Sequence, residues 1–108
     1  MDKIKAYNQR QINLMEDQIT KFKKGDLSMY NLISNLYALL KCINETEALW
    51  CKAVSPLVGN LDTINAIALD RQQADFSPLQ LREINQHIAE ILKLIVIYRK
   101  ENFLEFED

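Results

Sequence analysis

Apolar residues recur at alternating spacings of three and four along four separate stretches of this chain, at about residues 2–24, 29–43, 47–70 and 78–100. Such spacings place the apolar side chains on one face of an α-helix, because a helix completes a turn about every 3.6 residues. The pattern therefore predicts four amphipathic helices. The positions expected to face a common core are Ile12, Met15, Ile19, Phe22, Met29, Leu32, Ile33, Leu36, Leu39, Leu40, Ile43, Trp50, Val54, Leu57, Leu61, Ile64, Ala68, Leu81, Ile84, Ile88, Ile91, Ile95 and Tyr98.

Residues that favour helix ends separate these stretches. Gly25 follows a lysine-rich segment and is a natural left-handed stop for the first helix. Ser28 can cap the free amides at the start of the second helix. Before the fourth stretch, Ser77, Pro78 and Gln80 have the order of a capping box with proline at the first helical position. The end of the first helix and the starts of the second and fourth helices therefore each have a local sequence signal.

The third stretch contains a proline inside its apolar pattern. Its apolar positions keep one helical phase on both sides of Pro56. Continuity of phase favours a single bent helix, or two nearly coaxial helices with Ser55 as a cap. In both cases we expect a kink near Pro56.

Short connections between four helices indicate antiparallel neighbours. Two glycines and two prolines in 108 residues are too few for a turn-rich β architecture. The expected fold class is all-α, an antiparallel up-down four-helix bundle whose third helix is kinked near Pro56, in a single domain spanning residues 1–108. The acidic tail at 101–108 is expected to fray, although Phe103, Leu104 and Phe106 could dock on the bundle.

Charge is unevenly distributed along the chain. The overall formal charge is −2, but residues 1–24 carry a net charge of +3 and the remainder carries −5. This distribution lacks the basic footprint of a nucleic-acid binder. The sequence therefore predicts no direct contact with nucleic acid. A basic protein partner remains open.

The chain carries no recognisable targeting or membrane-spanning segment. The first residues lack the apolar core of a signal peptide, and the longest apolar runs are too short to cross a bilayer. Cys42 and Cys51 do not form a metal-type Cys-x-x-Cys pair and are expected to be free thiols. We therefore expect a cytoplasmic protein that does not enter a membrane.

The sequence predicts no catalytic, metal or cofactor site. Its single histidine, His87, lies between Glu83 and Glu90 at helical spacing, but this stripe is turned away from the apolar face and is best explained as solvated surface. Carboxylate-bridged metal bundles need inward-pointing histidines from several helices. A phosphate-binding loop would need clustered glycines, whereas Gly25 and Gly59 stand alone. We therefore do not expect an enzyme.

The most informative segment is 61–70 in the third stretch. When the core residues of this segment face inward, the residues on the opposite side of the helix are small, apolar or acidic. A solvated helix surface usually carries a mixture of Lys and Glu instead. Two explanations remain open: this side is buried in the core, or it is a docking surface whose carboxylates steer a basic partner. An unpaired carboxylate is costly to bury, which favours docking. The predicted partner-binding residues are Glu45, Glu47, Asp62, Asn65, Ala66, Leu69, Asp70 and Asp75.

At these residues the chain resembles a known family: the short helical immunity proteins encoded beside toxins in bacterial contact-dependent growth inhibition and related polymorphic toxin systems. The resemblance covers most of the chain and lies in its packing residues. The segments that carry it are Phe22-Lys23-Lys24-Gly25-Asp26-Leu27-Ser28, the leucine-rich second stretch, Trp50, and Leu61-Asp62-Thr63-Ile64-Asn65-Ala66-Ile67-Ala68-Leu69-Asp70. The chain departs from the family at Asp62, where Glu is commoner, and at Pro56.

The resemblance implies a cytoplasmic inhibitor that binds one cognate toxin protein, commonly a nuclease domain, as a monomer in a 1:1 complex. An acidic surface suits that role, since it complements the basic substrate groove of a nuclease. The alternative is a helical adaptor or self-associating bundle, for which Trp50, Leu69 and Phe103 would supply apolar contacts.

Overall fold

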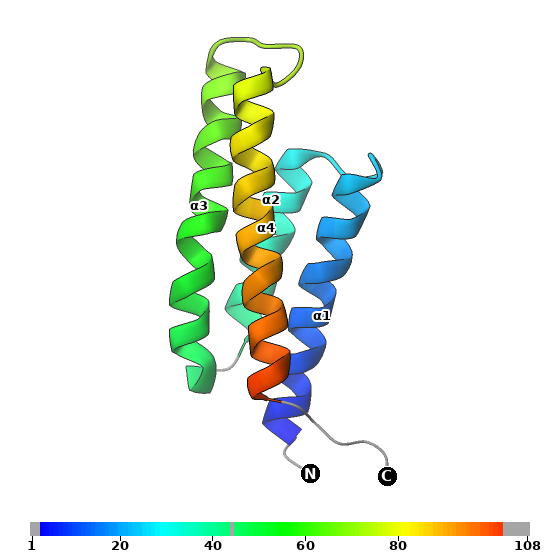
Figure 1. Ribbon diagram of the computed structural model, residues 1–108, viewed down its shortest axis with the longest axis vertical. Coiled ribbons are helices and arrows are strands. Elements are labelled where there is room, and N and C mark those ends of the chain that lie inside the picture. The colour runs from blue at the N-terminus through cyan, green and yellow to red at the C-terminus, as the bar shows by residue number, and fades with distance from the viewer. Residues whose placement is uncertain (1–2, 44, 103–108) are drawn as a thin grey trace.

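The computed structural model describes residues 3–43 and 45–102, and four α-helices account for most of them (Figure 1). The helices are α1 (Lys3–Lys23), α2 (Met29–Cys42), α3 (Ala48–Asp70) and α4 (Pro78–Glu101), and a short 3-10 helix, η1 (Glu45–Glu47), precedes α3. No strand occurs within these described ranges, so the predicted all-α class is confirmed. Residues 103–108, which include Phe103, Leu104 and Phe106, lie outside the described part of the chain.

Each helix packs against two others. α1 contacts α2 and α4, and α3 likewise contacts α2 and α4. α2 has only 14 residues, whereas α3 has 23 and α4 has 24. As Figure 1 shows, the connection between α3 and α4 therefore lies well beyond the connection between α1 and α2. At this projecting end, α3 and α4 are covered mainly by each other.

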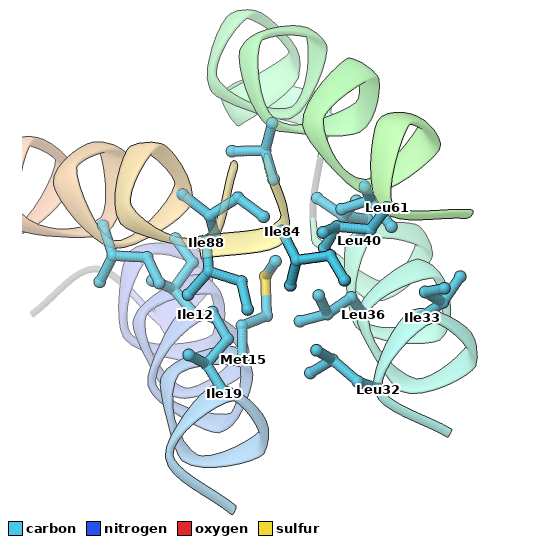
Figure 2. Packing of buried hydrophobic residues seen from close by; sticks show 14 of the residues in the cluster. Ile12, Met15, Ile19, Leu32, Ile33, Leu36, Leu40, Leu61, Ile84 and Ile88 are labelled. Carbon is cyan, nitrogen blue, oxygen red and sulfur yellow. The ribbon is translucent and has the colours of Figure 1, made fainter. Parts of the chain in front are cut away.

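One apolar cluster joins all four helices, and Figure 2 shows Met15, Leu36 and Ile88 pointing into the space between them. Most of the predicted core positions are buried. Five are not: Phe22, Leu39, Trp50 and Leu57 are half-buried, and Leu81 is 45% exposed. Val58, which was not among the predicted positions, is buried. Leu81 belongs to the first turn of α4, at the projecting end. Asn8, a fully buried polar residue of α1, was not predicted.

The predicted helix ends are confirmed at three positions. Ser28 caps α2, its Oγ accepting a hydrogen bond of 3.1 Å from the amide of Asn31. At α4, Ser77 Oγ accepts from the Gln80 amide at 3.1 Å while Gln80 Oε1 accepts from the Ser77 amide at 2.8 Å, which completes the capping box. Gly25 ends the first helix with a φ of +82°.

The third helix runs through its proline without a break. α3 begins at Ala48 and continues past Pro56 to Asp70, so the alternative of a single helix is confirmed. The other alternative, two helices with Ser55 as a cap, is wrong, because Ser55 lies inside α3. Proline lacks the amide that would bond to the carbonyl of Lys52, four residues earlier. Lys52 is exposed, so water can satisfy that carbonyl and the helix continues.

The end of α3 adopts a left-handed turn without glycine. Gln72 has a φ of +55°, and the next amide, that of Gln73, donates to the carbonyl of Ala68 at 2.9 Å. A side chain in this conformation costs roughly 1 kcal/mol, which glycine avoids. We expect Gln72→Gly to raise the free energy of unfolding by about 0.5–1 kcal/mol in urea denaturation. Gln72→Ala keeps the Cβ and should give no such gain; equal stability of the two variants would contradict the prediction.

An ion pair joins α1 to α4. Arg99 Nη2 lies 2.6 Å from Glu16 Oε1 and also donates to Asn13 Oδ1 at 2.6 Å. The Arg99 hydrogen bond lowers the pKa of Glu16, although partial burial opposes the shift. A lowered folded-state pKa stabilises the protein above the ordinary pKa of glutamate, and this contribution disappears as the pH falls through the lowered value.

Substitution of Glu16 should therefore have a pH-dependent effect. We expect Glu16→Gln to reduce the free energy of unfolding at neutral pH by at most about 1 kcal/mol, because both side chains are partly solvated. The difference from the wild type should shrink below about pH 4, where the carboxylate becomes protonated. Urea denaturation across pH 3–7 measures it, and a difference that grows toward acid pH would refute the assignment.

Candidate functional site

The outward strip of α3 is exposed to solvent. Asp62, Ala66, Leu69 and Asp70 are all exposed, and Leu69 retains 67% of its surface. The core side of the same helix consists of Val54, Val58, Leu61, Ile64 and Ala68. The structure thus decides between the two explanations for this strip: it is not sandwiched in the core. The strip therefore presents one large apolar side chain, Leu69, together with the carboxylates of Asp62 and Asp70 to solvent.

A groove of about 550 Å³ lies between the start of α2 and the end of α3. Three of the predicted residues, Asn65, Leu69 and Asp75, line it. The remaining lining residues are Ser28, Met29, Tyr30, Ala68, Gln73, Ala74 and Phe76. Sequence reasoning missed the wall formed by α2, and above all Tyr30, which is 67% exposed. An aromatic residue off the apolar stripe of its helix was the available signal.

Two other predicted residues lie in a separate shallow hollow. Ala66 and Asp70 line it together with Thr63, Ile67 and Arg71. Arg71 brings a positive charge to this hollow, so Asp70 does not stand in a purely acidic environment. Asp62 is exposed on the same helix and lies two turns before Asp70.

The remaining two predicted residues lie at the other end of α3. Glu45 is exposed and Glu47 half-buried, and about 34 Å of helix separates Glu47 from Asp70. Glu47 Oε2 accepts a hydrogen bond of 3.3 Å from the hydroxyl of Tyr98, which gives this carboxylate a role inside the bundle. The eight predicted residues therefore do not form one patch. Those that the structure gathers near the end of α3 are Asn65, Ala66, Leu69, Asp70 and Asp75.

The carboxylates near the end of α3 lack cationic partners. Within the described ranges, the Glu16–Arg99 pair is the sole salt bridge, and Asp62, Asp70 and Asp75 make none. All three carboxylates are exposed to water. They are accordingly available to a basic partner without first having to break an internal ion pair.

A pair of glutamines fastens the connection between α3 and α4. Gln73 Nε2 donates to Gln80 Oε1 at 2.9 Å, and Gln80 Nε2 donates back to Gln73 Oε1 at 3.1 Å. Gln73 Nε2 also donates to the backbone carbonyl of Asp75 at 3.1 Å. These amides hold the segment that carries Asp75 against the first turn of α4, a role that the sequence did not reveal.

The side chains considered for chemistry are His87 with its neighbouring glutamate Glu83, and the thiol of Cys51. No group of three or more His, Cys, Asp or Glu side chains among the described residues could hold a metal ion. Glu83 and His87 line a shallow hollow beside Ile64 and Ile67, and they form no ion pair with each other. Burial, and next the nearby Glu47 carboxylate, raise the pKa of the Cys51 thiol, which disfavours its nucleophilic thiolate.

Comparison of the chain with protein-family models, with curated proteins and with solved structures finds no match. Among the described helices, none is long and apolar enough to cross a membrane.

Proposed function

We propose that this chain is an immunity protein that binds and neutralises a cognate toxin through the C-terminal half of α3. The observation that carries this proposal is the exposure of Leu69, at 67%, on the same side of α3 as the carboxylate of Asp62 two turns earlier, with the exposed Asp70 next to Leu69 in the chain. An apolar centre excludes water when a partner docks, and flanking carboxylates steer a partner of opposite charge.

A basic nuclease domain is the toxin that suits this surface. Such domains carry Lys and Arg in the groove that holds the nucleic acid backbone, and an acidic protein surface can meet the same cations. The resemblance to immunity proteins of polymorphic toxin systems supports the same class. We infer a cytoplasmic inhibitor that acts as a monomer in a 1:1 complex, with no cofactor and no catalytic step of its own.

The proposal also includes how the four helices are arranged. We infer an antiparallel up-down bundle, supported by the short connections and by the contact of each helix with two others. We also infer a kink near Pro56, because a proline in a helix interior removes one backbone hydrogen bond and crowds the preceding turn. Such a bend would set the angle at which the end of α3 meets a partner.

Charge reversal on α3 tests the proposed function. The toxin encoded by the neighbouring gene would be titrated by calorimetry with the wild type and with the double variant Asp62→Lys, Asp70→Lys. We expect the double variant to bind about 100-fold more weakly, since both charges then repel a basic partner.

A matched control separates this local effect from a change in overall charge. Asp17→Lys with Glu90→Lys changes the net charge equally, at exposed positions of α1 and α4, and should leave affinity within about threefold of the wild type. Equal affinity of the double variant and the wild type would refute the site, and no binding of the wild type would refute the function.

Self-association is the competing function, and the structure weakens one of its supports. The indole of Trp50 donates to the carbonyl of Leu94 at 2.9 Å and lies edge-on to Tyr98, so its contacts lie within the bundle. Leu69 is exposed, and Phe103 lies outside the described residues. Light scattering that found a stable dimer, abolished by Leu69→Asp, would favour self-association over toxin binding.

A further inference from the structure

We infer that the groove between α2 and α3 receives one arginine or lysine side chain of the partner, with its apolar stem in the groove and its cationic head at Asp75. This inference rests on the proposed function for the identity of the partner, and it adds which chemical group is recognised and where. The eight residues predicted from sequence did not define it, since Met29 and Tyr30 were absent from them.

The lining of the groove suits a long unbranched stem. It includes the buried Met29 and Ala68, 5% and 7% exposed, and the exposed Tyr30 and Leu69, each 67% exposed. Burial of this apolar lining by a methylene chain that displaces water is favourable. Arginine and lysine side chains bury such stems while they keep their charged ends at the surface.

The charge of the groove selects a cation. Asp75 is the one ionisable acid or base among its lining residues other than the phenol of Tyr30. Arg71, the nearest cation in the sequence, lines the hollows on the other side of α3. A purely apolar guest would fill the groove but deprive Asp75 of water without replacing it, which is unfavourable. A guanidinium or ammonium group replaces the lost water by pairing with the Asp75 carboxylate, and it can also lie against the exposed ring of Tyr30.

The groove is organised before a partner arrives. Asp75 lies in the connection between α3 and α4, where the Gln73 side chain holds its backbone carbonyl and Gln80 holds Gln73. Fixing this segment in advance reduces the entropy that binding would otherwise lose. Gln80 is therefore a positioning residue for the groove, although it does not line it.

A small probe tests the groove without the toxin. We would titrate isotopically labelled protein with N-acetyl-arginine methylamide and, separately, with the corresponding citrulline derivative, which has the same shape and no charge. The arginine probe should shift the amide resonances of Met29, Tyr30, Leu69 and Asp75, with a dissociation constant on the order of 10 mM. The citrulline probe should bind at least about tenfold more weakly, because it cannot pair with Asp75.

Two variants make this outcome decisive. Asp75→Asn should abolish the preference for arginine over citrulline, whereas Asp17→Asn, which alters an exposed carboxylate of α1 outside the groove, should leave it intact. Absence of shifts at the groove, or a preference that survives Asp75→Asn, would overturn the inference. Selective binding of the arginine probe together with no binding of the toxin would refute the proposed function and uphold the groove.

Discussion

Replacing Leu61 with alanine should lower the free energy of unfolding by about 2–5 kcal/mol, whereas the same replacement at Leu69 should change it by less than about 0.5 kcal/mol. Both leucines belong to α3, but Leu61 is completely buried and Leu69 is 67% exposed. At Leu61 the truncation removes apolar contacts and leaves a cavity, because a packed core relaxes only partly. At Leu69 it removes surface that water already covers.

Urea denaturation followed by circular dichroism measures this contrast between the two leucines. The slope of free energy against urea should remain the same for both variants, so that the midpoints report stability directly. Similar losses at the two positions would mean that the outer strip of α3 packs inside the bundle. In that case the docking surface would have no physical basis.

Truncation of Tyr98 should have the largest effect of all. Tyr98 is 1% exposed, lies edge-on to Trp50 with ring centroids 5.7 Å apart, and donates its hydroxyl to Glu47. Tyr98→Ala should lower the free energy of unfolding by about 3–5 kcal/mol, since a buried ring and its aromatic contact both disappear. Calorimetric melting would detect a fall in Tm of well over ten degrees.

Tyr98→Phe serves as the matched control for that truncation. It keeps the ring and removes only the hydroxyl, so the expected loss is about 1 kcal/mol. Trp50 is the single tryptophan of the chain, and its fluorescence should shift to the red in the alanine variant and stay unchanged in the phenylalanine variant. A large loss from Tyr98→Phe would show that the hydroxyl, and not the packing of the ring, dominates.

Local signals made the helices predictable. Gly25, Ser28 and the Ser77–Gln80 pair act on atoms within a few residues of themselves, so the order of residues alone reveals their roles. The apolar phase likewise located Leu61 and Ile64 in the core. The failures followed from context: Ser55 looks like a cap beside Pro56, but the helix already in progress from Ala48 overrides that signal.

The candidate site was only partly predictable because it depends on distant segments. The strip of α3 was recognised from its own composition, but the groove also needs Met29 and Tyr30, which lie more than 30 residues earlier in the chain. No local pattern shows that the start of α2 lies beside the end of α3. The sequence likewise grouped Glu47 with the acidic site, whereas its carboxylate binds Tyr98 across the bundle.

The projecting ends of α3 and α4 have a consequence for how the molecule opens. Their terminal turns lie beyond the connection between α1 and α2 (Figure 1), so we expect their amide protons to exchange with solvent through local opening that leaves the remaining core intact. A protein bound there would close this route and slow exchange at Leu69 and Leu79, far from Tyr98 and Trp50. A bound partner should therefore slow amide hydrogen exchange at this end of the molecule and leave exchange at the other end unchanged.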